Sequence, residues 1–427
     1  MKQYLTEEIK MQFSDRIIKL AAEAGRELRP QFDEFDRIAY VNTARVLEAF
    51  SAHRVSEAMF APSTGYGYGD IGRDALDAIY ADVFGAEAAF VRHNIVNGTQ
   101  AIAIGLFGLL RPGDVMLSVT GKPYDTLNEV IGADIKNGDG SLADFGIKYD
   151  DVNLLSDGGV DYAGIEKKIA EYGDSIKVIF IQRSKGYMNR PTLAASEIGE
   201  IIKFVKARCR AYVAVDNCYG EFCDEAEPTA YGEDLIMGSL IKNPGGGMAE
   251  CGGYIAGTKR AVELASYRQT TVGIGTECGA TIGQNRNMFK GFFYAPHTVA
   301  QAKKTAALAA YIFDKLGYPV EPAWNGERHD IIQTVRLGTP EGLCAFCRGI
   351  QSGSPVDAYV TPEPWDMPGY ADKVIMAAGT FVSGASIELS ADGPLRPPYT
   401  AFFQGGLTYE SGKYAIMTAA DMIISAK

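Results

Sequence analysis

The chain has 427 residues, of which 47% are hydrophobic and 22% charged, a balance typical of a globular protein with a large core and unlike that of a disordered chain. Its 41 basic and 53 acidic residues give a formal net charge of −12, which argues against general nucleic-acid binding because that requires a dense basic face. The N-terminus lacks the apolar segment of a signal peptide, and no run reaches the roughly 18 apolar residues of a membrane span. The sequence therefore predicts a cytoplasmic protein.

Three regions follow one another along the chain. Residues 1–60 carry apolar positions at helical intervals, which predicts an N-terminal helical arm suited to packing on a partner. Residues 61–292 alternate strand-like runs with helical stretches, the pattern of a large doubly wound α/β domain on a mainly parallel sheet. Residues 293–427 open with a long helical stretch and continue as a smaller C-terminal α+β domain. The strand-like runs of the second region lie at 88–91, 115–119, 176–181, 211–215, 235–240 and 253–256.

Two of these runs end beside charged residues. The run 211–215 leads directly into Asp216, and the run 235–240 leads to Lys242 and a glycine-rich turn, which is the polarity that a buried parallel sheet gives its loop ends. A lysine that condenses with an aldehyde must be neutral, so we expect desolvation or nearby cations to lower its pKa. A carboxylate can hold the proton on a pyridine nitrogen. Taken singly the two residues could be a turn cap and a solvated loop lysine, but together they predict pyridoxal phosphate, bonded to Lys242 and held by Asp216.

Four segments spread over the chain carry a family resemblance: Gln182–Tyr187, Asp216–Phe222, Gly379–Gly393 and Arg396–Tyr399. Through them the sequence resembles the fold-type I pyridoxal-phosphate enzymes of the cystathionine and methionine gamma-lyase group. Within that group it is most similar to the branch labelled aluminium resistance protein or methionine gamma-lyase-like. The resemblance implies a transferase-like α/β fold with a large sheet domain and a smaller C-terminal domain.

The cofactor phosphate needs several hydrogen-bond donors, and a helix N-terminus supplies N–H groups with a favourable dipole. A predicted helix follows the strand at 88–91, so the amides of Gly98, Thr99 and Gln100 are candidate donors. The alternative is an ordinary helix cap at Asn97. The resemblance implies a cofactor-binding turn at this point and adds the hydroxyl of Ser239.

Tyr124 follows the predicted strand at 115–119. In the gamma-lyase group an aromatic residue at this point stacks on the pyridine ring and lies near the leaving group. The resemblance therefore implies that Tyr124 is the stacking residue, and it makes Tyr124 a candidate proton donor. With 23 tyrosines in the chain, a purely structural role is the alternative.

The glycines at 67, 69 and 72 match the spacing of a dinucleotide fingerprint, but Pro62 breaks the strand which that motif needs, and no acidic residue follows about 20 positions on. We reject nicotinamide binding. Related lyases lend a tyrosine and an arginine from this loop to the phosphate of a neighbouring subunit. Tyr66, Tyr68 and Arg73 are the candidates here, although Asp70 stands where the family has its arginine. A mobile glycine-rich surface loop is the alternative.

An amino-acid substrate presents a carboxylate, which arginine binds in a bidentate fork. Arg396 is the first candidate, because prolines stiffen the backbone around it and the family places such an arginine in its C-terminal region. Arg183 and Arg336 are the alternatives.

Cysteine and histidine spacing gives no sign of a metal site. The seven cysteines are odd in number and scattered, as in buried thiols of a reducing compartment. Cys344 and Cys347 have the spacing of a redox or zinc pair, but no second pair follows and the four histidines have no ligand spacing to them. We predict no metal, and no clustered carboxylates account for the aluminium label.

The resemblance implies a carbon–sulfur lyase in which Lys242 removes the Cα proton and the products are a 2-oxo acid, ammonia and a thiol. Methionine, cystathionine, homocysteine and cysteine all fit such an enzyme. An aminotransferase or a carbon–carbon lyase on the same scaffold is the alternative, and a non-catalytic pyridoxal-phosphate-binding stress protein is a third reading. Enzymes of this kind place the cofactor at a dimer interface, so the resemblance implies a dimer at least and often a homotetramer.

Overall fold

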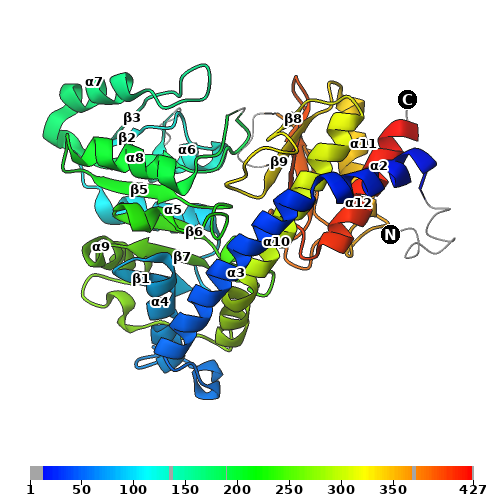
Figure 1. Ribbon diagram of the computed structural model, residues 1–427. Coiled ribbons are helices and arrows are strands. Elements are labelled where there is room, and N and C mark those ends of the chain that lie inside the picture. Colours follow the sequence, from blue (N-terminus) through cyan, green and yellow to red (C-terminus); the bar gives the residue numbers. More distant parts are fainter. Residues whose placement is uncertain (1–12, 134–137, 189, 368–371, 426–427) are drawn as a thin grey trace. The chain divides into compact units, whose positions relative to one another are not determined.

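The computed structural model describes residues 13–133, 138–188, 190–367 and 372–425 (Figure 1). The chain divides into two compact units. The large unit is Asn42–Phe293, and the small unit joins Met1–Val41 to Tyr294–Lys427. Two helices, α3 (Arg29–Ala52) and α10 (Asn285–Lys315), contain the points where the chain passes from one unit to the other.

The large unit is built on a sheet of seven strands. Across the sheet they are β1 (Ala88–Arg92), β7 (Gly253–Gly257), β6 (Leu235–Ser239), β5 (Tyr212–Asp216), β4 (Ile176–Gln182), β2 (Val115–Ser118) and β3 (Lys148–Asp151). Neighbouring strands from β6 to β3 are parallel, whereas β7 is antiparallel to both β6 and β1. The mainly parallel α/β sheet predicted from the sequence is confirmed.

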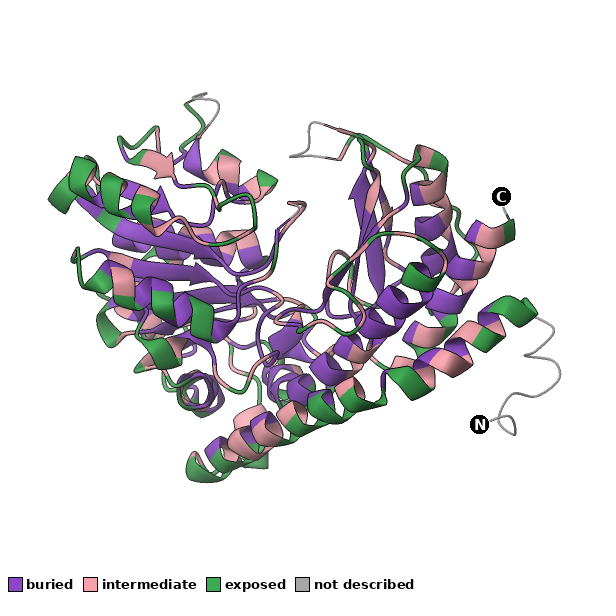
Figure 2. Cartoon of the chain, turned by 45° about the horizontal axis from the view of Figure 1, so that its top comes forward, coloured by how far each residue is buried: buried purple, intermediate pink, exposed green. Residues whose placement is uncertain are grey.

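Strands β6 and β7 are buried over their whole length and β5 is buried after Tyr212, as Figure 2 shows, because helices flank the sheet. These helices are α4 (Ile71–Phe84), α5 (Gly98–Leu109), α6 (Asp125–Ile131), α7 (Tyr162–Tyr172), α8 (Ala195–Lys206) and α9 (Lys259–Gln269), with short 3-10 turns η1 (Glu57–Phe60), η2 (Gly173–Ser175), η3 (Pro228–Tyr231), η4 (Asn243–Gly245) and η5 (Gly275–Glu277). Helix α5 packs closely on α9, where a β-carbon on Gly108 would lie 2.8 Å from the Cα of Ala265. The two helix backbones are thus in close contact near the C-terminal end of α5.

The small unit has an antiparallel sheet of five strands. Its strands, in order across the sheet, are β10 (Val374–Ala377), β11 (Ser390–Pro394), β12 (Thr400–Gln404), β9 (Ile332–Arg336) and β8 (Val320–Glu321). Helices α11 (Pro340–Ser352) and α12 (Tyr409–Ser425) pack on each other so closely that a β-carbon on Gly349 would lie 2.3 Å from the Cα of Ala419.

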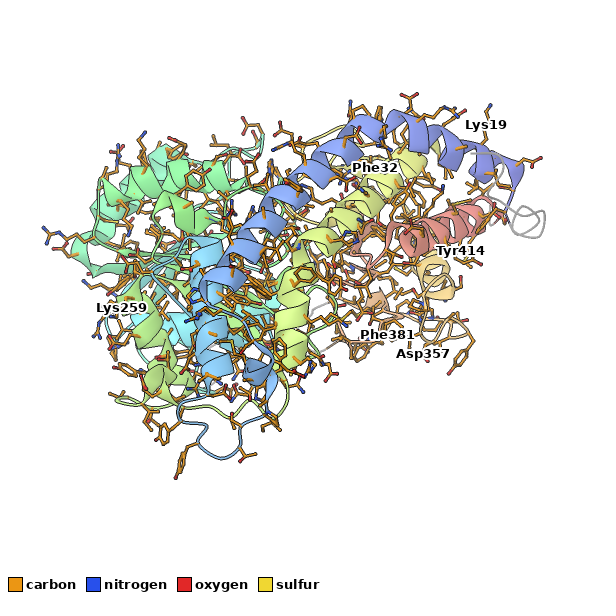
Figure 3. The ribbon with its side chains drawn as sticks, turned by 60° about the horizontal axis from the view of Figure 1, so that its bottom comes forward. Lys19, Phe32, Lys259, Asp357, Phe381 and Tyr414 are labelled. Carbon is orange, nitrogen blue, oxygen red and sulfur yellow. The ribbon has the colours of Figure 1, made fainter. Side chains whose placement is uncertain are left out.

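The N-terminal helices of the small unit are α2 (Asp15–Glu27) and the first part of α3. Ser14 Oγ donates to Asp421 Oδ1 at 2.5 Å, and Lys304 Nζ donates to both carboxylate oxygens of Asp36. The ring of Phe32, labelled in Figure 3, meets Tyr409 edge-on with 5.1 Å between the centroids. Across the described residues, we find no helix with both the length and the apolar character needed to cross a bilayer.

Candidate active site

Asp216 and Lys242 come from adjacent parallel strands of the large sheet. Asp216 is the last residue of β5 and lies opposite Met237 of β6. Strand β6 ends at Ser239, and Lys242 follows in the turn before η4. Because parallel strands end at the same edge of a sheet, this register brings the carboxylate, the hydroxyl and the amine to one place.

Helix α5 points its N-terminus at the same place. A β-carbon on Gly98, its first residue, would lie 3.1 Å from Cys218 Sγ, 3.4 Å from Ser239 Cβ and 3.9 Å from Lys242 Nζ. Glycine at this position therefore leaves space between the helix end and the turns after β5 and β6.

The residues around Gly98 fit a phosphate. Ser239 is 1% exposed, and its Oγ has no hydrogen-bond partner among the described residues. A buried hydroxyl without a partner costs free energy, so its hydrogen bond is available for a ligand. The ordinary cap considered from the sequence is also present, since Asn97 Oδ1 accepts from the N–H of Gln100 at 2.8 Å. This bond engages the Gln100 amide, whereas Gly98 and Ser239 lie at the space itself.

Asp216 and Lys242 influence each other's ionisation. Asp216 is 5% exposed, so burial raises the pKa of its carboxyl, against the attraction of Lys242 and a hydrogen bond from the N–H of Cys218 at 3.1 Å. Burial alone would lower the pKa of Lys242, but the neighbouring Cys218, Tyr219 and Asp216 outweigh it and raise that pKa. This direction is the opposite of the one expected from the sequence, because acidic groups rather than cations surround the amine.

Tyr124 precedes α6 and is fixed at both ends. Its N–H donates to Gln182 Oε1 at 2.8 Å, and its hydroxyl donates to Thr99 Oγ1 at 2.9 Å. Burial, with a further contribution from Asp216, raises the pKa of the Tyr124 phenol above its usual value. The hydroxyl therefore stays protonated near neutral pH, as a proton donor must.

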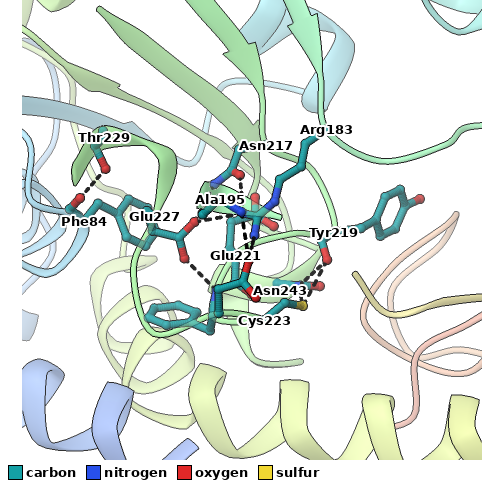
Figure 4. A network of polar contacts seen from close by, with 12 residues as sticks. Phe84, Arg183, Ala195, Asn217, Tyr219, Glu221, Cys223, Glu227, Thr229 and Asn243 are labelled. Carbon is teal, nitrogen blue, oxygen red and sulfur yellow. Dashed lines mark hydrogen bonds and ion pairs between the residues drawn. The ribbon is translucent and has the colours of Figure 1, made fainter. Parts of the chain in front are cut away.

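Arg183 lies inside the large unit with 0% exposure (Figure 4). Its guanidinium donates to Asn217 Oδ1 at 2.7 Å, to Glu227 Oε2 at 3.2 Å and to Asp224 Oδ2 at 2.7 Å. Asn217 is the residue after Asp216, so the network anchors the loop that directly follows the Asp216 carboxylate. These contacts give Arg183 a structural role, and its suggested role in substrate binding stays a prediction.

In the glycine-rich loop after Pro62 and the helix that follows it, the two tyrosines are exposed and the arginine is buried. Tyr66 and Tyr68 are 74% and 63% exposed, and their rings stack with 5.5 Å between centroids. The Arg73 side chain is buried, and its Nη1 donates to the carbonyls of Gly67 and Gly279. The two tyrosines are thus on the surface, whereas Arg73 joins two loops of its own chain.

Arg396 belongs to the small unit and is exposed beside Asp372, to which its Nη1 donates at 3.0 Å. Arg336, the other alternative, is the last residue of β9. The role of Arg396 in binding a substrate carboxylate stays a prediction.

Three residues of the site were not singled out by the sequence: Cys218, Tyr219 and Asn243. Cys218 Sγ faces Gly98, the Tyr219 ring lies against Lys242, and Asn243 Nδ2 donates to the Tyr219 and Glu221 carbonyls. Their signal in the sequence is that Asn243 adjoins Lys242, and that Cys218 and Tyr219 lie in the segment Asp216–Phe222 that carries the family resemblance. Over the ranges that the structure covers, no group of three His, Cys, Asp or Glu side chains has metal-binding geometry.

Comparison with known proteins identifies the family. The family model for methionine gamma-lyase matches residues 17–424. The chain belongs to the methionine gamma-lyase family. Its relative YnbB of Bacillus subtilis is 52% identical over 407 residues, which are 95% of this chain and 96% of YnbB.

Solved structures agree with this membership. A carbon–sulfur lyase involved in aluminum resistance from Clostridium novyi is 49% identical, with a TM-score of 0.93 over 97% of this chain and 99% of that one. A candidate cystathionine beta-lyase involved in aluminum resistance from Listeria monocytogenes is also 49% identical, with a TM-score of 0.92 over 95% of this chain and 99% of that one. The pyridoxal-5'-phosphate dependent protein YhfS of Escherichia coli, at 15% identity and a TM-score of 0.62 over 91% of this chain and 96% of its own, shares the fold.

Three predictions from the sequence are confirmed by these findings. The chain has the fold-type I architecture, its cofactor is pyridoxal phosphate, and it is a lyase of the carbon–sulfur class.

Proposed function

We propose that this methionine gamma-lyase family member eliminates a thiol from a sulfur-containing amino acid. The products are a 2-oxo acid, ammonia and the thiol, and water supplies the oxygen of the oxo group. The observation that supports this most directly is the meeting of Lys242 Nζ, Ser239 and Cys218 around Gly98, with the Asp216 carboxylate at the end of the adjacent strand.

Each residue of this site has a proposed task. When bound, pyridoxal phosphate supplies an electron-withdrawing ring that stabilises negative charge at Cα. Asp216 holds a proton on the ring nitrogen. The amide of Gly98 and the hydroxyl of Ser239 bind the phosphate, together with the amides of Thr99 and Gln100 where the cap at Asn97 allows it.

Lys242 is proposed to anchor the cofactor and then to act as the base. Its amine removes the proton from Cα and holds it at Nζ, 3.9 Å from the Tyr219 ring centroid. Loss of a Cγ substituent also requires removal of a Cβ proton, which we assign to the same amine. General acid–base steps of this kind contribute about 100- to 10,000-fold each.

Tyr124 is proposed to stack on the ring and to protonate the leaving sulfur. The raised pKa of its phenol keeps the proton in place, and the bond to Thr99 Oγ1 at 2.9 Å fixes the hydroxyl beside the first turn of α5.

A second candidate reaction is beta-elimination, because the relative from Listeria monocytogenes is described as a candidate cystathionine beta-lyase. The two reactions differ in their products, since beta-elimination from cystathionine releases homocysteine and pyruvate, whereas gamma-elimination from methionine releases methanethiol and 2-oxobutanoate. An aminotransferase would instead require a second oxo acid and would release no thiol.

The test begins with the visible absorption spectrum of the purified protein before and after borohydride reduction. We expect a cofactor band that disappears on reduction, leaving a pyridoxyl group on Lys242 in a peptide mass map. Methionine and cystathionine are then supplied separately, and thiol, 2-oxo acid and ammonia are each measured. A cofactor attached elsewhere, or oxo acid that forms only with a second oxo acid and without thiol, would overturn the proposal.

We further propose that the protein works as a dimer at least. Six exposed apolar or aromatic residues of the large unit lie on three loops or, in the case of Ile71, at the start of α4: Tyr66, Tyr68, Ile71, Val96, Val272 and Ile282. Hydrogen bonds join two of these loops, from Gly279 N to Tyr66 O and from Ile282 N to Ser63 O. Exposed apolar surface of this kind marks protein interfaces, and a second copy of the chain is the occupant that the resemblance supplies. Light scattering measures the molar mass in solution and also distinguishes a dimer from a tetramer. A monomer mass would refute the proposal.

The cytoplasm is the proposed location. All seven cysteines are free thiols in the structure, which fits a reducing compartment.

A further inference from the structure

Tyr219 has a backbone conformation that side-chain-bearing residues seldom adopt. Its φ is +72°, in the left-handed region that is unfavourable for a residue other than glycine. Such a conformation persists only where the surroundings hold it. Contacts of its main chain hold Tyr219 in this conformation, and the conformation sets what its ring contacts.

The main chain of Tyr219 is held by the turn that carries Lys242. Asn243, the residue after Lys242, is 0% exposed, and its Nδ2 donates to the carbonyls of Tyr219 and Glu221 at 2.9 Å each. The thiol of Cys223 donates to the same Tyr219 carbonyl at 3.4 Å. One buried amide thus ties the loop after β5 to the lysine turn after β6.

The neighbouring residue fixes the loop from the other side. A β-carbon on Gly220 would lie 2.5 Å from Arg183 Cδ, so the loop backbone passes directly over the buried arginine. As Figure 4 shows, the Tyr219 ring extends away from the polar network around Asn217, Glu227 and Arg183. The strained backbone therefore directs the ring out of that network.

The ring meets the amine of Lys242. The distance from Lys242 Nζ to the centroid of the Tyr219 ring is 3.9 Å, well inside the roughly 6 Å limit of a cation–π contact. The titratable groups that act on this amine are Asp216 at the end of β5, Cys218, Tyr219 and Glu221 on the loop after it, and Tyr124 before α6. Of these, Tyr219 also presents its ring face to the amine, and the ring attracts an ammonium through its π electrons.

We propose that Tyr219 is a positioning residue for the proton-carrying lysine: its ring face holds the Lys242 amine and stabilises the protonated form. This inference rests on the proposed function, in which Lys242 takes the Cα proton. An amine that has just accepted a proton becomes an ammonium, and the face of the Tyr219 ring stabilises that positive charge. The tie from Asn243 keeps ring and amine together, because it joins the two turns that carry them.

Two substitutions of Tyr219 distinguish the contribution of its ring from that of its hydroxyl. Tyr219→Phe keeps the ring and removes the phenol, whereas Tyr219→Leu removes the ring and keeps an apolar side chain. Both leave a residue other than glycine at φ +72°, so the backbone strain is the same in the two variants. Thermal unfolding of each variant shows whether the fold is retained.

The first readout does not depend on catalysis. Full-length protein freed of cofactor is labelled with trace acetic anhydride over a range of pH, and peptide mass mapping gives the extent of reaction at Lys242 relative to exposed Lys259 on α9 (Figure 3). The pH midpoint of labelling reports when the amine loses its proton.

We expect wild type and Tyr219→Phe to share one midpoint, and Tyr219→Leu to have a midpoint lower by roughly 0.4 to 1.5 pH units. Opening the site to water without losing a cation–π contact would ease solvation of the ammonium and move the midpoint upward. An unchanged or higher midpoint in a folded Tyr219→Leu protein would therefore overturn the proposal, as would a shift of the same size in Tyr219→Phe.

The second readout uses the protein loaded with pyridoxal phosphate. Exchange of the substrate Cα hydrogen with deuterium from D2O follows the lysine step alone. Tyr219→Leu should slow this exchange and change its pH profile, with Tyr219→Phe restoring both. If the wild type took up no cofactor, the proposed function would fail, yet the labelling midpoint would still decide whether Tyr219 stabilises the Lys242 ammonium.

Discussion

The Tyr124 hydroxyl donates a hydrogen bond to Thr99 Oγ1 at 2.9 Å, joining the turn before α6 to the first turn of α5. These residues are 25 positions apart in the sequence, and the bond brings the expected stacking residue to the expected phosphate-binding turn. It also fixes where the phenolic proton lies.

Tyr124→Phe should therefore keep the ring and lose the proton donor. We expect kcat to fall about 100- to 10,000-fold, while the absorption band of the bound cofactor is retained because the stacking surface is unchanged. Steady-state kinetics on methionine and on cystathionine measure the effect. If kcat stayed within threefold of wild type with both substrates, Tyr124 would not be the acid.

Ser239→Ala should act on cofactor binding and on stability in opposite directions. A hydrogen bond to a charged group contributes about 1.5–3 kcal/mol, so the Kd for pyridoxal phosphate should rise roughly tenfold to a hundredfold. In the cofactor-free protein the buried Ser239 Oγ has no partner among the described residues, so its removal should leave the melting temperature unchanged or higher. Fluorescence titration and thermal unfolding measure the two effects. A lower melting temperature without cofactor, at unchanged Kd, would contradict this account.

Arg183→Met should destabilise the protein rather than change its affinity for substrate. The substitution leaves Glu227, which is 4% exposed, without its ion-pair partner, and breaking a buried pair in this way costs about 3–5 kcal/mol. Urea unfolding monitored by circular dichroism gives the change. A variant with wild-type stability and a raised KM would instead show that Arg183 binds substrate.

Arg396→Lys tests the other arginine predicted to bind the substrate carboxylate, which lies in the small unit. The ion pair of Arg396 with Asp372 is exposed on both sides, so its loss should change stability by no more than about 0.5 kcal/mol. If Arg396 binds the substrate carboxylate, loss of its planar fork should raise KM about tenfold. The same unfolding and kinetic measurements apply, and an unchanged KM would exclude Arg396 as the carboxylate ligand.

The buried carboxyl of Glu233 should make the stability of the folded protein depend on pH. It is 3% exposed, neither carboxylate oxygen has a hydrogen-bond partner among the described residues, and burial raises its pKa to about 8. The folded protein thus retains a proton that the unfolded chain loses above the usual glutamate pKa of 4.5. The resulting stabilisation is full below that value and is lost as pH rises through about 8.

Glu233→Gln should consequently raise the melting temperature at pH 8.5 by more than at pH 5. Scanning calorimetry at both pH values measures the difference, with Glu200→Gln on the exposed surface of α8 as the control. Equal shifts of the Glu233 variant at the two pH values would show that the carboxyl is already ionised in the folded protein.

The strands that the sequence predicted are those whose apolar residues are buried on both faces. All six runs expected in the large domain are strands, including β4, with the sequence Ile-Lys-Val-Ile-Phe-Ile-Gln, and β5. Strand β3 was missed because Lys-Tyr-Asp-Asp at the edge of the sheet has no apolar run. Strand β11 was missed for a similar reason, since Ser-Ala-Asp-Gly-Pro is buried yet mostly polar or small.

The cofactor could be predicted without a structure from the order of Asp216 and Lys242 at the ends of apolar runs, because strand ends carry the reactive residues of a parallel sheet. The side chains that surround that lysine could not be predicted in this way. The bonds from Asn243 to the Tyr219 loop and the burial of Arg183 under Gly220 depend on the register of β5 and β6 and on the loops between them. Contacts of this kind arise between segments distant in the chain, and no local pattern of residues encodes them.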